Sequence, residues 1–372
     1  MLHLSKFFPP PSYLDFPITG LDISDRSIKY VELKKNGAGL RLKRAGKRNL
    51  PSGLILAGEI KKPDELAANL AEFLKPLGVD HVVAALPEER AYISVMSLPK
   101  MEKNQIREAV ESGLPEKIPL PAGESVFDFE FLKPAAAAVD GVKINDNQVP
   151  HQDVVVYAFS KTMVQSYLDV YLSAGLYPVS FAMETAALSR ALMPESHENP
   201  PTMIVDFGKT RTTFVIIAGG LVRFSSTVNV AGESLDQAIA KSLNIPVNAA
   251  EKTKKENGMS RASENRAVFE SILPVIAAVS DEIERHILFW NTHAEHVHQS
   301  EPQISKVILS GGDSNLIGFS EYLAAKLGLS VELGNPWVNV APFEKYIPEI
   351  TFNESLALGS AIGLGLMALD TN

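Results

Sequence analysis

Cysteine is missing from this sequence, and so is an excess of basic residues. The absence of cysteine excludes disulfide frameworks, thiolate metal sites and a cysteine nucleophile, and it fits a reducing compartment. The formal net charge of −9 argues against a general nucleic-acid-binding protein, because phosphate contacts require a basic surface. Neither a P-loop nor a Gly-x-Gly-x-x-Gly turn after a strand occurs, so those two nucleotide-binding folds receive no support.

Long hydrophobic runs are also scarce. Met1–Phe8 is not followed by the apolar stretch of a secretory signal. The run Leu356–Leu369 is shorter than the roughly 20 residues that span a bilayer, and it contains glycines. We therefore predict a buried, closely packed helix at this position. The length of 372 residues and the 45% hydrophobic content predict two or three folded domains.

Two stretches of the chain resemble each other. Leu21–Lys29 and Val205–Thr213 each consist of an apolar strand that ends in Asp, a tight polar turn and a second strand. Two such units can face each other across a cleft, where backbone N–H groups of the turns bind phosphate oxygens. The two Asp side chains then lie near a magnesium ion, usually through its water molecules, because magnesium dehydrates reluctantly. The duplication therefore predicts a phosphate-binding cleft between two related halves.

The pattern between these stretches predicts the organisation of the chain. An apolar stripe at helical spacing predicts a helix over Pro63–Leu77, and Val82–Leu86 reads as a buried strand. Strand and helix patterns between residues 92 and 174 predict a module that interrupts the first half. The second half begins at Thr202, after a proline-rich joint.

A third motif, Val307–Asn315, is a strand that ends at two glycines, and it resembles an adenosine motif in which such glycines let the backbone approach the purine and ribose. With these three motifs the sequence resembles the actin-like ATPase superfamily. Within it, the sequence resembles the type IV pilus assembly protein PilM family, which is related to the division protein FtsA. The resemblance runs from about Ile18 to Leu369. Shorter elements carry the narrower resemblance: Ala85-Leu86-Pro87, Ser97–Met101, Met183–Leu192 and Asn335-Pro336-Trp337.

The resemblance implies an α/β protein with the actin-like ATPase fold, in which two related mixed-sheet halves surround a nucleotide cleft. It implies a flexible segment over 1–17 and a first half over 18–91, to which 175–200 and 346–372 return. It further implies a small inserted α+β subdomain over 92–174. The second half would cover 201–345 and include a helical upper subdomain at about 232–300.

The resemblance also implies that ATP and magnesium are bound. Asp22 and Asp206 would organise the metal ion through water. The implied nucleotide-binding residues are Ser24, Ser27, Lys29, Gly208, Thr210, Thr212, Gly232, Lys254, Gly311, Gly312 and Asn315. Lys254 lies in the charged run Glu251–Glu256, which by itself predicts a solvated helix face.

Glu184 is the one candidate catalytic residue, since it could position a water for hydrolysis. A carboxylate stabilised at a helix N-terminus explains Glu184 equally well. Several positions depart from the family pattern. Ser24 and Glu233 stand where the family has glycine, and Asp25, Lys209 and Arg211 replace small residues. We therefore expect nucleotide binding with weak or no hydrolysis.

The function that the resemblance implies is a cytoplasmic ATP-binding scaffold of type IV pilus assembly or of related type II secretion. Its partner would be the cytoplasmic N-terminal tail of a PilN-like inner-membrane protein, which would recruit it to the inner face of that membrane. Ala85–Arg90 and Thr162–Ala174 are the expected groove walls. Three alternatives stay open: an active ATPase, an FtsA-like division or cytoskeletal protein, and a scaffold that has lost its nucleotide. Self-association is also left open.

Overall fold

The computed structural model describes residues 17–36, 39–121, 123–132, 151–194, 199–293, 303–342 and 345–371. Apart from its last residue, the N-terminal segment 1–17 expected from the sequence lies outside these ranges. Within them, no helix is both long enough and apolar enough to cross a membrane.

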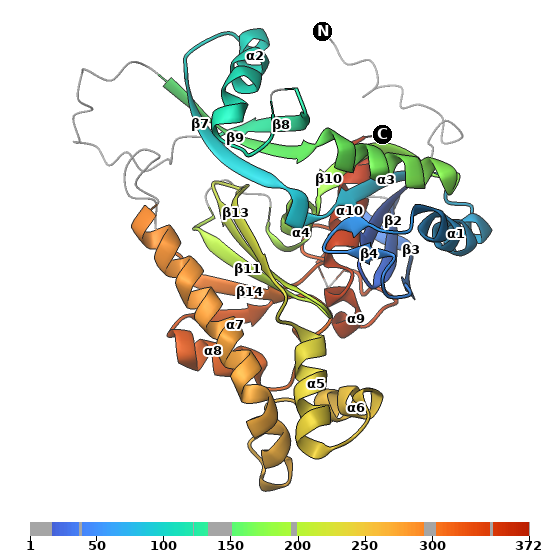
Figure 1. Cartoon of the computed structure of the whole chain (residues 1–372), viewed down its shortest axis with the longest axis vertical. Helices are drawn as coiled ribbons and strands as arrows, with labels where there is room; N and C mark the ends of the chain where they lie inside the picture. Colours follow the sequence, from blue (N-terminus) through green and yellow to red (C-terminus); the bar gives the residue numbers. More distant parts are fainter. Residues whose placement is uncertain are drawn as a thin grey trace.

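Two five-stranded sheets form the centre of the molecule (Figure 1). The first has the strand order β10-β6-β1-β2-β3, and the second has the order β13-β12-β11-β14-β15. The strands of the first sheet are β1 (Ile18–Ser24), β2 (Ser27–Asn36), β3 (Gly39–Asn49), β6 (His81–Leu86) and β10 (Tyr177–Met183). Those of the second are β11 (Thr202–Phe207), β12 (Thr212–Ala218), β13 (Leu221–Val228), β14 (Lys306–Ser310) and β15 (Ser330–Leu333).

The two sheets share one topology. β1 pairs antiparallel with β2 and parallel with β6, and β11 pairs antiparallel with β12 and parallel with β14. The turns β1–β2 and β11–β12 consequently occupy equivalent places in the two halves. The predicted pair of related mixed sheets is confirmed, and the copies of the duplicated motif form the matching hairpins.

Helices cover both faces of the first sheet. In β6, Val82, Ala84 and Leu86 pack in the same core as residues of α1 (Pro63–Leu74) and α3 (Lys161–Ser173). The alternate residues Val83 and Ala85 pack with α4 (Glu184–Leu192) and α10 (Gly359–Asp370). Side chains of a strand point alternately to its two faces, so β6 is apolar from Val82 to Leu86 because both of its faces are covered.

The C-terminal helix α10 packs at backbone distance against its neighbours. A Cβ at Gly20 of β1 would lie 2.3 Å from the amide nitrogen of Gly365. A Cβ at Gly363 would lie 1.7 Å from the carbonyl oxygen of Ala187 in α4. The prediction of a buried, closely packed helix is thus confirmed, and backbone contact requires glycine at position 363.

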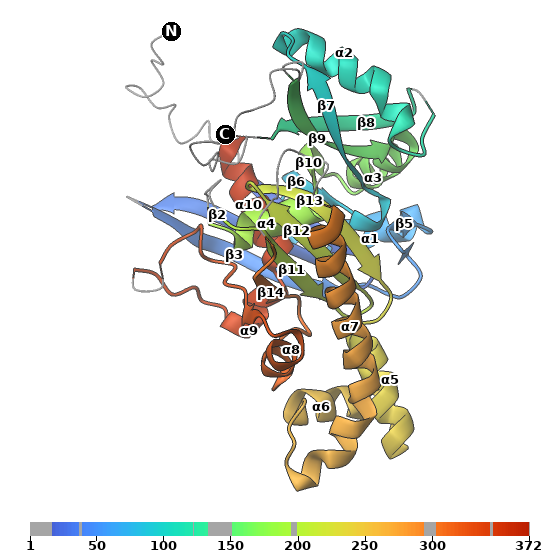
Figure 2. The ribbon, with the colours of Figure 1, turned by 90° about the vertical axis from the view of Figure 1, so that its left-hand side faces the viewer.

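A third sheet, ordered β7-β9-β8, lies between β6 and β10 in the chain and projects beyond the first sheet (Figure 2). Its elements are β7 (Tyr92–Pro99), α2 (Lys103–Gly113), β8 (Ser125–Phe131) and β9 (His151–Ser160). They enclose a separate core that includes Met96, Ile106 and Val156. Tyr157 of β9 donates a hydrogen bond to the carbonyl oxygen of Val222 at 3.1 Å, which joins this subdomain to the second half.

The second sheet carries the long helix α7 (Arg266–His293), together with α5 (Gly232–Leu243), α6 (Val247–Asn257) and α8 (Phe319–Leu327). Ile272, Ile276 and Ile283 of α7 recur at helical spacing and are buried in the core of this half. In Figure 1, α5 and α6 lie beside the start of α7 at the far end of the molecule. Two short elements complete the fold: the hairpin β4 (Ile55–Leu56)–β5 (Glu59–Ile60) and the helix α9 (Phe352–Leu356).

Candidate functional site

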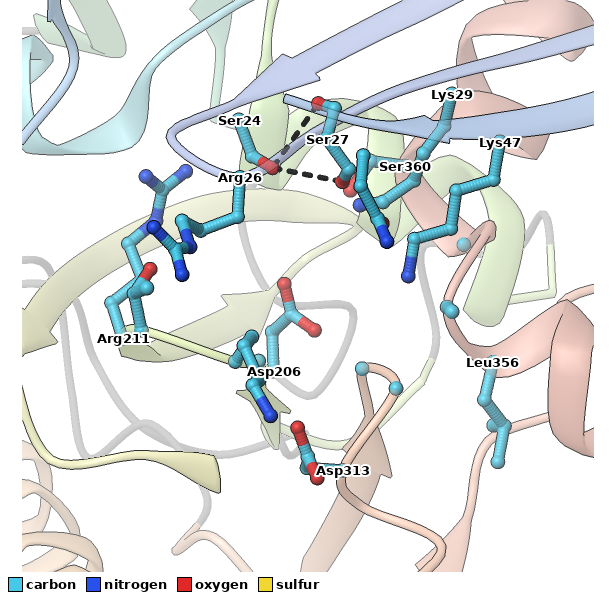
Figure 3. Close-up of a pocket in the computed structure, with 18 of the residues that line it drawn as sticks. Ser24, Arg26, Ser27, Lys29, Lys47, Asp206, Arg211, Asp313, Leu356 and Ser360 are labelled. Atoms are coloured by element: carbon cyan, nitrogen blue, oxygen red, sulfur yellow. Dashed lines mark hydrogen bonds between the residues drawn. The ribbon is translucent and has the colours of Figure 1, made fainter. Parts of the chain in front are cut away.

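A cavity of about 500 Å³ lies between the two halves, where both strand–turn–strand units end (Figure 3). Both turns, β3, the start of α4, α6 and the loops around β14 and α9 contribute to its wall. Nine of the residues predicted from the sequence line it: Ser24, Ser27, Lys29, Glu184, Asp206, Gly208, Thr210, Gly311 and Gly312. The remaining predicted residues do not line it: Asp22, Thr212, Gly232, Lys254 and Asn315.

The first turn is a two-residue hairpin loop. Ser24 pairs with Ser27, and Asp25 and Arg26 form the loop. Among the described non-glycine residues, only Ala57 and Asn244 have a positive φ, so the first turn requires no left-handed residue. Ser24 at the family's glycine position is thus unstrained, and its hydroxyl donates to the carbonyl oxygen of Ser27 at 3.3 Å.

Asp25 holds this turn against a neighbouring hairpin. Its carboxylate accepts hydrogen bonds from the backbone N–H of Ala57 at 3.0 Å and of Gly58 at 3.4 Å. Tyr167 of α3 donates to the carbonyl oxygen of Gly58 at 3.1 Å. Asp25, which replaces a small residue of the family pattern, therefore links the cavity wall to the β4–β5 hairpin. The hairpin in turn is bonded to α3.

Asp22 is fully buried behind the cavity. Its Oδ2 accepts a hydrogen bond from Lys29 Nζ at 2.9 Å, and its Oδ1 is buried without a hydrogen-bond partner among the described residues. Burial lowers the pKa of Lys29, but Asp22 raises it more in combination with Glu184 and Asp206, and the net shift is upward. Lys29 lines the cavity and Asp22 does not, so Asp22 affects the cavity by fixing the position of the Lys29 ammonium group.

The second turn is built from backbone contacts. Gly208 donates its N–H to the carbonyl oxygen of Arg211 at 3.0 Å, and its own carbonyl oxygen accepts from the N–H of Gly232 at 3.0 Å. Thr212 is fully buried and donates to the carbonyl oxygen of Val230 at 2.6 Å. Thr212 and Gly232 thus support the turn from behind, while Gly208 and Thr210 face the cavity.

Asp206 lines the cavity, and within the described ranges its carboxylate has no hydrogen bond or ion pair. Burial raises the pKa of Asp206, whereas Lys29 and Arg211 oppose that shift. Gly311, at φ +92°, passes so close that a Cβ there would lie 2.6 Å from Asp206 Oδ1. Only glycine fits at this position, which explains one glycine of the third motif.

Arg211 of the second turn is buried among carboxylates of the first half. Its Nη2 donates to Glu184 at 2.8 Å, and its Nη1 lies 2.7 Å from Glu89 and 3.6 Å from Asp25. The three acids come from the start of α4, the turn after β6 and the β1–β2 turn. A single guanidinium therefore joins three segments of the first half to the second half.

Glu184 and Glu88 are both buried at this junction. Burial raises the pKa of Glu184, as do the charges of Asp22 and Glu89, while Arg211 opposes the shift. Burial also raises the pKa of Glu88 to about 7, although its carboxylate accepts hydrogen bonds from Ser225 of β13 and from Thr185 at 2.7 Å. Both carboxyl groups therefore hold protons at higher pH than in an unfolded chain.

Lys254 is buried in a network behind the second turn. Its ammonium group lies 2.9 Å from Asp236 and 2.5 Å from Asp313, and it donates to the carbonyl oxygen of Gly232 at 3.1 Å. The prediction of a solvated face is wrong for this residue, because one position of the charged run points into the protein. A Cβ at Gly232 would lie 2.1 Å from Asp313 Oδ2, so this network requires glycine there.

Several charged residues that line the cavity were not among the predicted site residues. They are Arg26, Lys47, Lys209, Arg211, Glu251, Lys255 and Asp313. Arg26, Lys209 and Arg211 lie inside the two duplicated stretches, so their positions were a usable signal. Lys47 lies on β3 directly opposite Lys29, and only the strand register reveals it.

The profile of the type IV pilus assembly protein PilM family matches residues 20–369. The chain belongs to this family. A solved PilM-PilN type IV pilus biogenesis complex contains a chain that is 26% identical, with a TM-score of 0.73, and the match covers 95% of this chain and 99% of that one. The expectation of a PilM-type, actin-like protein is confirmed.

Two further solved structures share the fold of this PilM-family protein. The ethanolamine utilization protein EutJ from Carboxydothermus hydrogenoformans is 16% identical with a TM-score of 0.52, over 96% of this chain and 90% of that one. MreB5 of Spiroplasma citri, bound to ADP, is 12% identical with a TM-score of 0.53, over 92% of this chain and 94% of that one. At these identities the likeness concerns the fold.

The oxygen atoms around the cavity suit the magnesium ion that the fold family implies. Asp206 presents a carboxylate that no described residue engages, and Oδ1 of Asp22 is buried behind Lys29 without a hydrogen-bond partner in the described ranges. Magnesium prefers oxygen ligands and keeps several of its waters, so one carboxylate in the cavity and one behind it fit a water-mediated ion. Asp206 would make the nearer contact.

Proposed function

We propose that this PilM-family protein is an ATP-binding scaffold of type IV pilus assembly that docks the cytoplasmic tail of a PilN-like inner-membrane protein. The polar cavity between the two duplicated turns is the observation that carries the nucleotide assignment. The PilM-PilN complex formed by the 26% identical relative supports the choice of partner. The protein would work in the cytoplasm and reach the inner face of the membrane through that partner.

The phosphate chain would lie between the two turns. The backbone of Ser27 and Gly208 and the Thr210 hydroxyl would lie beside its oxygens, and Lys29 supplies positive charge. Gly311 and Gly312 leave the backbone accessible for the adenosine. Magnesium, when bound, would neutralise phosphate charge, and Asp206 would hold it through water. Asn315, Gly232 and Lys254 would act from outside the cavity by shaping its wall.

We further propose that turnover is slow. Glu184 is the candidate general base for hydrolysis, but its carboxylate accepts a hydrogen bond from Arg211 at 2.8 Å. A general base has to hold the attacking water within hydrogen-bond reach, and the guanidinium of Arg211 occupies this carboxylate instead. The bound nucleotide would act as a structural ligand that favours one cleft geometry.

The proposed partner groove lies near Ala85–Arg90 and α3. This region connects with the cavity, because Asp25 of the first turn binds the β4–β5 hairpin and Tyr167 of α3 binds the same hairpin. A ligand that repositions the first turn would therefore act on the groove wall through that hairpin. Binding of nucleotide and of the tail should then be coupled, and the coupling is reciprocal.

Calorimetric titration tests the nucleotide assignment. The purified protein is titrated with Mg-ATP beside Asp22→Ala, Asp206→Ala and the surface control Asp64→Ala. We expect saturable one-to-one binding by the wild type and by the control, and a loss of about tenfold or more in both cleft variants, as for the removal of a charged ligand. A folded wild type that binds no nucleotide would contradict this part and leave a nucleotide-free scaffold.

A second titration tests the partner. It uses the cytoplasmic segment of the PilN-like protein from the same organism. Leu172 on α3 is 47% exposed, and Leu288 on α7, which belongs to neither expected groove wall, is 63% exposed. We expect Leu172→Glu to weaken binding by about tenfold or more and Leu288→Glu to leave it unchanged. Equal effects of the two variants would contradict this placement of the groove.

A further inference from the structure

The cations that line the cavity fall into two groups. Six cationic side chains and four carboxylates contribute to its wall. Four of the cations are committed to carboxylates at close range. These pairs are Lys29–Asp22 at 2.9 Å, Lys209–Asp236 at 2.6 Å, Arg211–Glu184 at 2.8 Å and Lys255–Glu251 at 2.8 Å. Arg26 and Lys47 remain.

Arg26 and Lys47 have no ion pair or side-chain hydrogen bond with any residue that the structure describes. Figure 3 shows both side chains reaching into the same cavity from the edge of the first sheet. Arg26 belongs to the β1–β2 turn, and Lys47 belongs to β3. Neither side chain contributes to the fold through a partner, so their charges are available to a ligand.

Like charges face each other at this edge of the sheet. Lys47 pairs directly with Lys29 in the β2–β3 register, so their side chains lie on one face. Burial lowers the pKa of Lys47, and the charge of Lys29 lowers it further, while Asp313 and Glu251 oppose the shift. An anion between these side chains would relieve the repulsion, as a phosphate chain does when it is bound by lysine and arginine.

Carboxylates for a metal ion are scarcer than cations. Asp206 is the carboxylate on the cavity wall that no described cation engages by ion pair, and Asp22 lies behind Lys29. A magnesium ion neutralises phosphate charge, but in this cavity the side chains of Arg26 and Lys47 can neutralise much of that charge. The cavity therefore offers more built-in positive charge than it offers metal ligands.

We propose that Arg26 and Lys47 bind the phosphates of the nucleotide and let the cleft hold a polyphosphate without magnesium. This inference rests on the proposed nucleotide binding and extends it to the form of the ligand. Arg26 reaches the phosphates from the first turn, and Lys47 reaches them from β3. Magnesium then strengthens binding through Asp206 and is not required for it.

The test is calorimetric titration with ATP in buffer that contains either magnesium or EDTA. The proteins are the wild type, the double variant Arg26→Ala/Lys47→Ala and the control Lys252→Ala/Arg266→Ala. Lys252 is 79% exposed and Arg266 is 77% exposed, so the control removes the same charge from the surface. Adenosine is titrated in parallel because it lacks phosphates.

We expect the wild type to bind ATP in EDTA within about tenfold of its affinity in magnesium. The double variant should lose about 100-fold in both buffers, as two charge-assisted hydrogen bonds predict. Its affinity for adenosine and the ATP affinity of the control should not change. A charge-preserving variant, Arg26→Lys/Lys47→Arg, should retain ATP binding within about fivefold.

Thermal unfolding tests whether the double variant is folded, and we expect its Tm within about 3 °C of the wild type because neither side chain has a polar partner in the part of the chain that the structure describes. Unchanged ATP affinity of the double variant would overturn the inference, and so would wild-type binding that disappears in EDTA. Both results leave the proposed nucleotide binding intact. A wild type that binds no nucleotide in either buffer would contradict the proposed function as well.

Discussion

The two turns have the same backbone arrangement but use their charges in opposite ways. In the first turn the carboxylate of Asp22 is committed to Lys29, while Arg26 is unpaired among the described residues. In the second turn Arg211 is committed to Glu184 and Glu89, while the carboxylate of Asp206 is unpaired among them. Among the described residues, the two strand–turn–strand units thus present one unpaired cation, Arg26, and one unpaired carboxylate, Asp206, to a single cavity. Equivalent positions in such halves should not be assumed to have equivalent roles.

The largest effect should come from removing the committed arginine of the second turn. Arg211→Ala leaves Glu184 and Glu89 buried without their counter-ion, and we expect the free energy of unfolding to fall by about 3–5 kcal/mol. Urea denaturation measures the change. The matched control is Arg266→Ala, whose i,i+4 pair is exposed and should cost less than about 0.5 kcal/mol. Equal losses in the two variants would show that Arg211 does not hold the halves together.

The next effect concerns pH at the same junction. The folded-state pKa of Glu88 is raised to about 7, above the value of 4.5 expected for the unfolded chain. The folded state therefore binds an extra proton between these two values, and stability falls as pH rises through this window. Over this window, the titration of Glu88 lowers the free energy of unfolding by about 3 kcal/mol.

Glu88→Gln removes this titration. Denaturation at intervals from pH 5 to pH 8 should show the difference in unfolding free energy between wild type and variant moving in the variant's favour as pH rises. The exposed control Glu65→Gln should give a constant difference. A constant difference for Glu88→Gln as well would mean that this carboxyl is not perturbed.

A pair of smaller effects separates the two aspartates. Asp22→Asn leaves Lys29 without its carboxylate, and we expect a loss of about 1–3 kcal/mol in the free energy of unfolding. Asp206→Asn removes a carboxylate that no described residue engages and whose pKa burial raises, so stability at pH 7 should be unchanged or higher. Chemical denaturation of both variants in nucleotide-free buffer compares them. A greater loss for Asp206→Asn would reverse the assignment of roles.

The smallest effect is expected at Ser24. Its backbone does not occupy the left-handed region, so restoring the family's glycine relieves no strain. Ser24→Gly should lower stability by no more than about 1 kcal/mol and change ATP affinity less than about threefold. Calorimetry and denaturation check both values. A large gain in ATP affinity would show that the serine side chain blocks the phosphates.

Much of the fold could be predicted from the sequence, because the duplicated stretch and the apolar patterns are local signals. The helix over Pro63–Leu77, the buried strand Val82–Leu86 and the buried C-terminal helix follow from such signals, whereas the two mixed sheets follow from the family resemblance. The backbone positions that face the cavity could also be predicted, since Gly208 and Gly311 lie at strand ends in the motifs. These features depend on spacing along the chain.

The pairing of charges could not be predicted in the same way. Arg211 contacts Glu89 and Glu184, which lie in other segments of the chain, and no local pattern indicates which carboxylates it selects. Lys254 belongs to a run that looks solvated, yet one turn of α6 places it against Asp236. Whether a charge is committed or free depends on long-range packing, and this distinction determines what the cavity can bind.

The most direct test of the central claim is equilibrium titration of the wild type with ATP, ADP, AMP and adenosine, repeated with Arg26→Ala and Asp206→Asn. If the free groups of the two turns bind the phosphate chain, affinity should fall with each phosphate removed. Arg26→Ala should reduce the dependence of affinity on the number of phosphates in both magnesium and EDTA. Asp206→Asn should reduce this dependence only in magnesium. Adenosine binding as tight as ATP binding, or a series that neither variant alters, would contradict the account.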